Sequence, residues 1–355
     1  MIKNKVIIIA EIGVNHNGKV NIAKKLIMAA KKSGANYVKF HNWKAEDLVT
    51  NGANMAPYQI KNAKKKMTQI EMLRPLELSN DKIYLLKKFS EKNKINFLSS
   101  PFDEKNFLYL SNFLKCKLIK IPSGEINNYL MLSKSDLKKH KLIISTGMSN
   151  LKEIAETVNF IAKTKIFKIL NDNIRIINKK KHQYIKNRIY ILHCVTDYPV
   201  ADQFANLSCI KTLKDKLQLN IGYSDHTLGV VAPLIAVALG AQIIEKHITL
   251  NNKMKGPDHR ASLNPTEFKK MCSYIRKYEL MMGNGVKKIQ KCEIQNFKIA
   301  RKSIYARTFI KKGDLFTLKN LSVKRPAEGI SPNKYFKVVG KKSNKNYKID
   351  QLIKI

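Results

Sequence analysis

The chain has 355 residues, of which 67 are Lys or Arg and 26 are Asp or Glu, so its net charge is +41. This length allows one large core with a smaller second domain, and a hydrophobic fraction of 44% is typical of a water-soluble globular protein. No apolar run approaches the roughly 18 residues of a membrane span, so no membrane partner is expected. The five scattered cysteines lack a C-x-x-C pair and predict reduced thiols, which agrees with a cytoplasmic location.

The large positive charge is a common signature of nucleic-acid-binding proteins. Here the excess is overwhelmingly lysine, and arginine, which binds phosphates and base edges through paired hydrogen bonds, is sparse. The lysines are also spread along the whole chain, among many Asn and Ile residues. We interpret them as a solvated surface and expect no specific nucleic-acid partner. A basic nucleic-acid-binding protein is the alternative from another functional class.

Short apolar runs alternate with helical periodicity along the first part of the chain. The runs predict strands at 6–10, 37–40, 95–98, 118–121, 142–144, 189–192, 221–223 and 241–244. Helices are predicted at 19–32, 81–93, 103–113, 130–139, 150–163, 207–217, 229–239 and 265–281. This repeat favours an α/β fold, a (β/α)8 TIM barrel over residues 1–283, rather than a six-stranded doubly wound sheet.

Three other segments break this repeat. Segment 41–80 is too long for a simple connection, and we expect a lid or binding loop there. Segment 165–188 is rich in Lys, Asn and Ile and is interpreted as a surface insertion. Residues 284–297 are predicted to be a polar linker, and the short β-type runs of 298–355 predict a small, mostly-β domain.

Two of the predicted strands are followed by a histidine each, His226 and His247. Active sites of parallel barrels form at the carboxyl ends of the strands, so we expect the two imidazoles to lie close together. With Asp225, Glu245 and Asp258 nearby in sequence, they suit a divalent metal with nitrogen and oxygen ligands. Their spacing matches no regular zinc motif, and two histidines that only stabilise the structure are the alternative.

The same end of the barrel is expected to gather lysines, hydroxyls and carboxylates. The set is Glu11, Lys39, Ser100, Lys120, Ser123, Glu125, Ser145, His193, Thr196, Ser224, His226, His247 and Asp258. Ammonium and hydroxyl groups suit a phosphorylated carboxylate, and a metal with two carboxylates can polarise a carbonyl and move protons. Surface lysines and helix-capping carboxylates are the alternative interpretations of Lys39, Lys120, Glu11 and Glu125.

Many of these motifs together resemble the sialic acid synthases, the family of N-acetylneuraminate and legionaminic acid synthases. The motifs occur in order along the chain: AEIGVNHNG at 10–18, VKF at 38–40, KIPSGE at 120–125, STGM at 145–148, SDHT at 224–227, EKH at 245–247, GPDH at 256–259 and KRP at 324–326. The resemblance implies a TIM barrel followed by an antifreeze-like (SAF) domain. It also implies condensation of phosphoenolpyruvate with an N-acetylmannosamine-type sugar to a nonulosonic acid, with release of phosphate.

The resemblance further implies roles for individual residues. His226 and His247 would bind Mn²⁺, with Mg²⁺ or Co²⁺ as alternatives, and Glu125 would be the acid/base carboxylate. Phosphoenolpyruvate would contact Lys39, Ser100, Lys120, Ser123, Ser145 and Ser224, and the sugar hydroxyls would contact Glu11, Tyr198 and Asp258. Arg325 would reach the N-acyl group of the sugar in the barrel of a second subunit, so a domain-swapped homodimer is expected.

Three features depart from the family's pattern. His41 and Asn42 stand where Gln-Thr is usual, Ala327 and Glu328 change the usual Pro-Gly-Asn-Gly after Arg325, and segment 165–188 is long and basic. These departures affect the expected sugar contacts and leave the metal and phosphate positions unchanged. The resemblance leaves the acceptor open between N-acetylmannosamine and a 2,4-diacetamido-trideoxy sugar, and the motifs IPSGE at 121–125 and SDHTLG at 224–229 favour the legionaminic type. A pseudaminic acid synthase and a 2-keto-3-deoxy sugar acid synthase are the alternatives.

Overall fold

The computed structural model describes residues 5–63, 67–170 and 173–355. Residues 1–4, 64–66 and 171–172 lie outside this description, so the predictions for segments 41–80 and 165–188 are compared without them. The chain divides into two compact units, Met1–Gly283 and Asn284–Ile355, and each is described by itself. None of the described helices is both long enough and apolar enough to cross a membrane.

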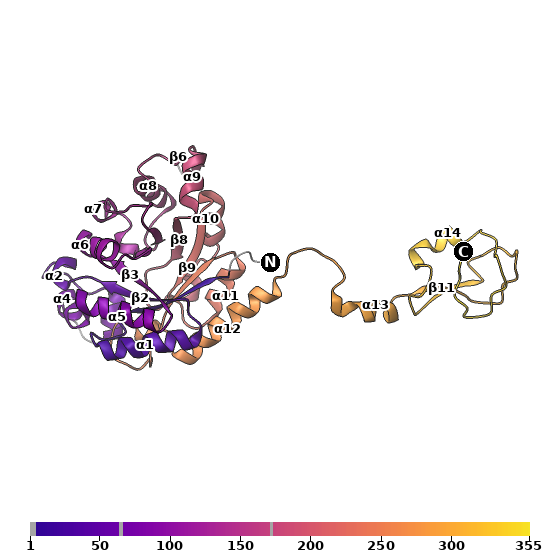
Figure 1. Ribbon diagram of the computed structural model, residues 1–355, viewed down its shortest axis with the longest axis horizontal. Helices are drawn as coiled ribbons and strands as arrows, with labels where there is room; N and C mark the ends of the chain where they lie inside the picture. The colour runs from indigo at the N-terminus through magenta and orange to yellow at the C-terminus, as the bar shows by residue number, and fades with distance from the viewer. Residues whose placement is uncertain (1–4, 64–66, 171–172) are drawn as a thin grey trace. The chain divides into compact units, whose positions relative to one another are not determined.

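In the described part of the first unit, eight parallel strands form one sheet with helices around it (Figure 1). The strands are β1 (Ile7–Gly13), β2 (Tyr37–Asn42), β3 (Asn96–Pro101), β4 (Leu118–Ile121), β5 (Lys141–Ser145), β8 (Ile189–Cys194), β9 (Asn220–Asp225) and β10 (Ile243–His247). Their order is β3-β2-β1-β10-β9-β8-β5-β4, and the two end strands, β3 and β4, also contact each other. The sheet is thus a near-closed barrel, which confirms the predicted fold class.

The outer layer consists mainly of the helices that follow the strands. They include α1 (Val20–Ser33), α5 (Asn80–Lys92), α6 (Glu104–Leu108) with a π-helical turn (Tyr109–Phe113), α8 (Leu151–Ile161), α10 (Cys209–Leu217), α11 (Val231–Ala238) and α12 (Pro265–Met281). Their apolar faces pack on the outward positions of the strands and form the largest buried cluster. The predicted cap of α8 is confirmed, because the Asn150 side chain accepts a hydrogen bond from the Glu153 N–H.

The helix predicted at 130–139 is much shorter in the structure, where α7 covers only Tyr129–Leu132. The residues after it bond locally instead of continuing the helix. The Ser133 hydroxyl donates to the Leu130 carbonyl, and the Lys138 N–H donates to Oδ1 of Asp136. Ser and Asp side chains compete with helical hydrogen bonds in this way, so the apolar periodicity alone overestimated the helix.

Segment 165–188 is more than a surface insertion, and that interpretation was wrong for the described part. It forms an antiparallel pair, β6 (Phe167–Leu170) and β7 (Asn173–Ile176), followed by α9 (Lys179–Lys186). Ile166, Phe167 and Ile185 are buried in the main core, and the His182 ring is hydrogen-bonded to the Leu217 carbonyl. The basic composition concealed a set of apolar positions that pack against α8 and α10.

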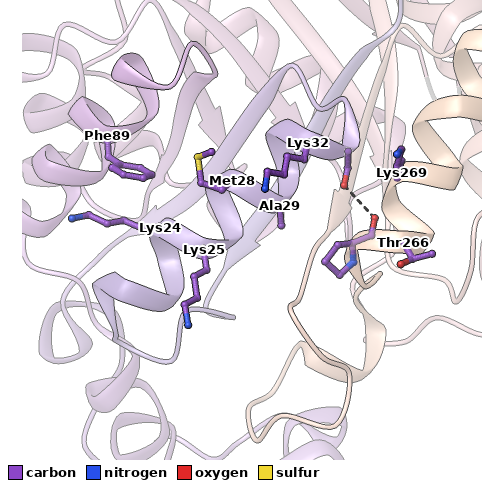
Figure 2. Close-up of a pocket in the computed structure, with 10 residues that line it drawn as sticks. Lys24, Lys25, Met28, Ala29, Lys32, Phe89, Thr266 and Lys269 are labelled. Atoms are coloured by element: carbon purple, nitrogen blue, oxygen red, sulfur yellow. Dashed lines mark hydrogen bonds between the residues drawn. The ribbon is translucent and has the colours of Figure 1, made fainter.

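A shallow hollow lies on the outer helix layer between α1 and α12 (Figure 2). The Ser33 hydroxyl joins the two helices there by donating to the Pro265 carbonyl at 3.2 Å. Lysines surround the hollow, namely Lys24, Lys25, Lys32 and Lys269. Since it lies among the helices and contains no strand-end residue, it is separate from the site predicted by the sequence.

The second unit has its own small core. Strands β11 (Ser303–Ala306) and β12 (Leu321–Lys324) pair antiparallel, and a short helix, α14 (Tyr335–Val338), follows them. The buried cluster contains Ile304, Ala306, Ile310, Phe316, Leu321, Val338, Tyr347 and Ile353. Before the first strand, the segment predicted as a linker includes the start of another helix, α13 (Ile294–Ala300).

Candidate active site

A cavity of about 440 Å³ lies at the carboxyl ends of the barrel strands. Twelve of the predicted site residues line it: Glu11, Lys39, Lys120, Ser123, Glu125, Ser145, Thr196, Tyr198, Ser224, His226, His247 and Asp258. They come from different strands and from the loops that follow them. The alternation of β and α elements therefore brings together side chains up to about 250 positions apart in the sequence, as parallel barrels require.

The cavity floor follows from the period of two along each strand. Five inward-facing positions carry aliphatic side chains that fill the barrel interior: Ile9, Leu98, Ile143, Leu192 and Ile243. Two residues further along the same strands, the inward-facing positions are Glu11, Ser100, Ser145, Cys194 and Glu245. The inside of the barrel thus changes from apolar to polar within one layer, and the polar layer forms the base of the site.

The register of β9 and β10 sets the two histidines side by side. Ser224 pairs with Glu245 and Asp225 pairs with Lys246, so the next positions on both strands are His226 and His247. Their ring centroids are 5.5 Å apart. Asp225 and Lys246 point away from the cavity and form a fully buried ion pair, with Nζ to Oδ2 2.5 Å. This pair fixes the register immediately before the histidines.

Glu245 is the centre of a buried charge network. Its Oε1 atom lies 2.9 Å from Nζ of Lys39, 2.7 Å from Nζ of Lys120 and 3.0 Å from the Ser224 hydroxyl. Sequence reasoning considered Glu245 only as a neighbour of the metal site and did not place it between the lysines. Burial lowers the pKa of Lys39 to about 7. Repulsion from Lys120 also lowers this pKa, and the attraction of Glu245 partly opposes the shift.

Glu11 lies between a lysine and a histidine. Lys39 Nζ is 2.9 Å from its Oε2 atom and His41 Nε2 is 3.0 Å from its Oε1 atom. Neither contact is aligned as a hydrogen bond, so both carboxylate oxygens are buried without a hydrogen-bond partner. The positive charge of Lys39 thus attracts the Glu11 carboxylate, whose oxygen atoms can still accept hydrogen bonds from a ligand.

The residues present fit a metal held by two imidazoles. Nδ1 of His226 lies 2.7 Å from the Val195 carbonyl, which fixes the proton on Nδ1 and leaves the Nε2 lone pair for a ligand. Nδ1 of His247 is buried without a hydrogen-bond partner, and Oδ2 of Asp258 is 3.9 Å from it. Among the described residues, no group of three or more His, Cys, Asp or Glu side chains is arranged to hold a metal. An ion bound here would take its other ligands from substrate or water.

Carboxyl groups on two other loops complete the site. Glu125 is half-buried and accepts a hydrogen bond from Asn128 at 2.7 Å, and burial raises its pKa. Asp258 is buried beside the histidines, and burial raises its pKa to about 6. The ring of Tyr198 lies 4.0 Å from that of His226, measured between centroids. The cavity therefore contains carboxyls in different environments, as proton transfer requires.

Comparison with known proteins assigns both units of the fold to known families. The model of the NeuB family matches residues 26–287, and the model of the SAF domain matches residues 301–355. The chain belongs to the NeuB family. The matches cover both units of the fold, and the second unit is the SAF domain of this NeuB-family chain.

Named relatives match the NeuB-family chain over almost its whole length. The N,N'-diacetyllegionaminic acid synthase of Campylobacter jejuni is 46% identical over 99% of both chains. The protein of the same name from Legionella pneumophila is 41% identical over 96% of this chain and 90% of its own. The solved structure of the N-acetylneuraminic acid synthetase from Leptospira borgpetersenii is 33% identical, covers 82% of this chain and 90% of its own, and has a TM-score of 0.67.

Three predicted site residues of the NeuB-family chain do not line the cavity. His193 is buried on β8, and its Nε2 atom is hydrogen-bonded to the Ala205 carbonyl at 2.8 Å. Ser100 is fully buried on β3, and its hydroxyl has no hydrogen-bond partner. Arg325 belongs to the second unit, directly after β12. The predicted contacts of Ser100 with phosphoenolpyruvate and of Arg325 with the sugar stay predictions.

One wall of the cavity comes from segment 41–80, which the sequence indicated only as a lid or binding loop. Its described part contains α2 (Ala45–Leu48), α3 (Pro57–Ala63), α4 (Gln69–Leu73) and a 3₁₀ turn (Arg74–Leu76). The wall residues are Trp43, Leu48, Val49, Tyr58, Gln59, Gln69, Met72, Leu73 and Leu76. The apolar spacing of these short helices did not identify the individual wall residues. Trp43, the single tryptophan of the chain, could have indicated this segment as part of the site.

Proposed function

We propose that this NeuB-family chain is a transferase-type synthase that condenses phosphoenolpyruvate with an N-acylated amino sugar to form a nonulosonic acid and phosphate. A 2,4-diacetamido-trideoxymannose is the proposed acceptor and a legionaminic-type acid the product. The observation that carries this proposal is the convergence of two buried ammonium groups, two imidazoles and several carboxylates in one cavity. The names of the similar relatives support the choice of acceptor.

The lysine side of the cavity is proposed to bind phosphoenolpyruvate. Lys39 and Lys120 supply the positive charge for its phosphate and carboxylate, and the hydroxyls of Ser123, Ser145 and Ser224 supply hydrogen bonds. The Ser145 hydroxyl is buried without a partner in the structure, so a ligand oxygen can satisfy it. Glu245 holds the two ammonium groups together before the substrate arrives.

The open-chain sugar is proposed to bind beside it in the same cavity. Glu11, which contacts Lys39, and Tyr198 and Asp258 line the cavity and present oxygen atoms to sugar hydroxyls. His226 and His247 are proposed to hold a divalent ion, Mn²⁺ in the first instance, which when bound would polarise the aldehyde oxygen. The apolar wall of segment 41–80 shields the reacting atoms from bulk water.

The reaction requires a new bond between C3 of phosphoenolpyruvate and the aldehyde carbon. A water oxygen bonds to C2, and the bond between C2 and the oxygen that links it to phosphorus breaks, so phosphate leaves with this bridging oxygen. The water oxygen remains on C2 as the keto oxygen, and its two protons pass to the former aldehyde oxygen and to the departing phosphate. Glu125 is proposed to take the proton from the attacking water, because its carboxyl is half-buried next to the serine loop that binds phosphate.

A domain-swapped homodimer is proposed to complete the sugar site. Arg325 of one protomer would reach the N-acyl group of the sugar bound to the other. The first residues of the second unit support an association of this kind, because Val286, Ile289, Ile294 and Ile299 expose more than half of their surface. The enzyme is proposed to act in the cytoplasm.

The test is phosphate release from phosphoenolpyruvate in the presence of Mn²⁺, with N-acetylmannosamine, with 2,4-diacetamido-trideoxymannose or without sugar. We expect release that needs the diacetamido sugar and stops when EDTA is added. His226→Ala should abolish the metal-dependent turnover while the thermal unfolding of the protein is unchanged. Release that proceeds without sugar, or no release with either sugar, would contradict the proposed reaction.

A further inference from the structure

A single side chain of segment 41–80 joins two loops of the barrel. Nδ2 of Asn62, in α3, donates hydrogen bonds to the carbonyl of Tyr198 at 2.9 Å and to the carbonyl of Pro257 at 2.7 Å. The two carbonyls belong to the loops after β8 and β10, the strands on either side of β9 in the sheet. One amide group therefore uses both of its N–H donors to connect three segments.

The two loops carry side chains proposed to contact the sugar. Tyr198 lines the cavity itself, and Pro257 precedes Asp258, which also lines it. A carbonyl position restrains the side chains next to it, so the Asn62 bridge restrains the distance between Tyr198 and Asp258. Helix α3 is thereby connected to the sugar side of the cavity, and its bridge makes no contact with the lysine side.

A second contact lies on the same face of α3. Tyr58 is four residues before Asn62, which places both side chains on one side of the helix. Its ring centroid is 4.9 Å from that of Tyr198, and both rings line the cavity. The helix thus meets the Tyr198 loop twice, once through the ring and once through the backbone carbonyl.

The described side chains of α3 lie outside the buried apolar clusters. With seven residues the helix is too short to be stable alone. None of its described residues belongs to a buried apolar cluster, whereas Trp43, Ala45, Ile70 and Leu76 of the same segment form one with Val14. The Asn62 bridge and the Tyr58 ring therefore supply, for the described part of α3, the fixation that the apolar cluster supplies to the rest of the segment.

We propose that Asn62 is a positioning residue that fixes the acceptor-sugar side of the cavity by bridging the Tyr198 and Pro257 loops to α3. This inference rests on the proposed function, because it assigns the two loops to sugar binding. Asn62 acts through Tyr198 and Asp258, so its loss should weaken sugar binding and leave phosphoenolpyruvate binding unchanged.

The test compares Asn62→Asp with Asn62→Gln. Asp keeps the size of the side chain but replaces the donors with a carboxylate that faces two carbonyls, while Gln keeps both donors on a longer arm. Asn51→Asp is the matched control, because Asn51 is exposed in the same segment. Each protein is assayed for the KM of sugar, the KM of phosphoenolpyruvate and kcat, and thermal unfolding confirms that each is folded.

We expect Asn62→Asp to raise the KM of the sugar at least tenfold, with the KM of phosphoenolpyruvate within twofold of the parent. Asn62→Gln should recover part of the loss, and Asn51→Asp should resemble the parent. Hydrogen exchange of the amides at 196–200 and 255–259 should accelerate severalfold in Asn62→Asp only. A raised sugar KM without faster exchange would overturn the positioning role in favour of direct contact, and equal changes in both KM values would also overturn it.

The exchange measurement separates this inference from the proposed function. If the parent protein releases no phosphate with any sugar, the proposed reaction fails and the exchange data alone decide the bridge. Faster exchange of both loops in Asn62→Asp would then still support the bridge. Unchanged exchange would overturn it whatever the reaction is.

Discussion

Lys120 and Glu245 form an ion pair at the base of the cavity, with 2.7 Å between Nζ and Oε1. The same carboxylate oxygen also contacts Lys39 and the Ser224 hydroxyl. Two buried ammonium groups repel each other unless an anion lies between them. Glu245 is this anion in the free protein, so it determines both where the lysines point and how much positive charge the cavity presents.

Replacing Glu245 with Gln should destabilise the protein and impair turnover. The variant leaves two buried ammonium groups without their shared counter-charge, and breaking a buried ion pair in this way costs about 3–5 kcal/mol. Thermal unfolding should show a clear decrease in Tm, and kcat/KM for phosphoenolpyruvate should fall at least a hundredfold. Glu46→Gln is the control, because its ion pair with Arg74 is exposed and such pairs contribute little to stability. Equal Tm values for the two variants would contradict the buried network.

The pH dependence of phosphoenolpyruvate use should report on Lys39. Burial lowers the pKa of Lys39 to about 7, so the side chain is charged below that pH and increasingly neutral above it. The anionic substrate favours the charged form, so kcat/KM for phosphoenolpyruvate should fall as the pH rises from 7 to 9. Lys39→Arg stays charged throughout and should remove this decline even if its activity is lower. Lys44→Arg is the control, because Lys44 is exposed, and this variant should keep the decline of kcat/KM. If the decline persists in Lys39→Arg, a group other than Lys39 causes it.

Glu125→Gln should lose activity and gain stability. As the proposed proton acceptor, Glu125 should contribute about a hundredfold or more to kcat. Burial raises its pKa, so the folded state binds more protons than the unfolded state between the two pKa values, and the parent loses stability as the pH rises through that interval. The Tm of Glu125→Gln should therefore exceed that of the parent at pH 7 and match it at pH 4. A variant less stable than the parent at pH 7 would argue against the buried carboxyl.

Gly13→Ala should damage both the fold and the site. Gly13 has φ +51°, and a Cβ atom there would lie 2.8 Å from Oε1 of Glu11 and 3.5 Å from Cε1 of His247. The left-handed backbone alone costs a non-glycine residue about 1–2 kcal/mol, and the contact would displace Glu11. We expect a lower Tm and a raised KM of the sugar. Gly52→Ala is the control, since nothing lies within 4 Å of its Cβ position; similar effects for both would exclude the crowding at Gly13.

The eight strands and the positions of both histidines were predictable from the sequence. Each strand is a short apolar run followed by polar residues, and parallel pairing then places those residues at one end of the barrel. The central role of Glu245 was not predictable, because it depends on the lysines of two other strands converging on one oxygen atom. The spacing within a strand carries no information about such a meeting.

The bridge of Asn62 shows the same limit more strongly. Its partners are backbone carbonyls 136 and 195 residues away, and every residue has a carbonyl. The short α7 was mispredicted because local bonds of Ser133 and Asp136 outweighed an apolar periodicity. Segment 165–188 was misinterpreted because its lysines obscured the apolar side that packs on the core.

The buried ion pair between Asp225 and Lys246 has a consequence for exchanging parts between related barrels. The two side chains lie on neighbouring strands and face away from the cavity, yet they align the strands on which His226 and His247 lie. Consider a chimera that takes β9 from one relative and β10 from another. If only one of the two relatives has both the aspartate and the lysine, the chimera contains one buried charge without its partner. These two strands and the helix between them, α11, therefore behave as one transferable module.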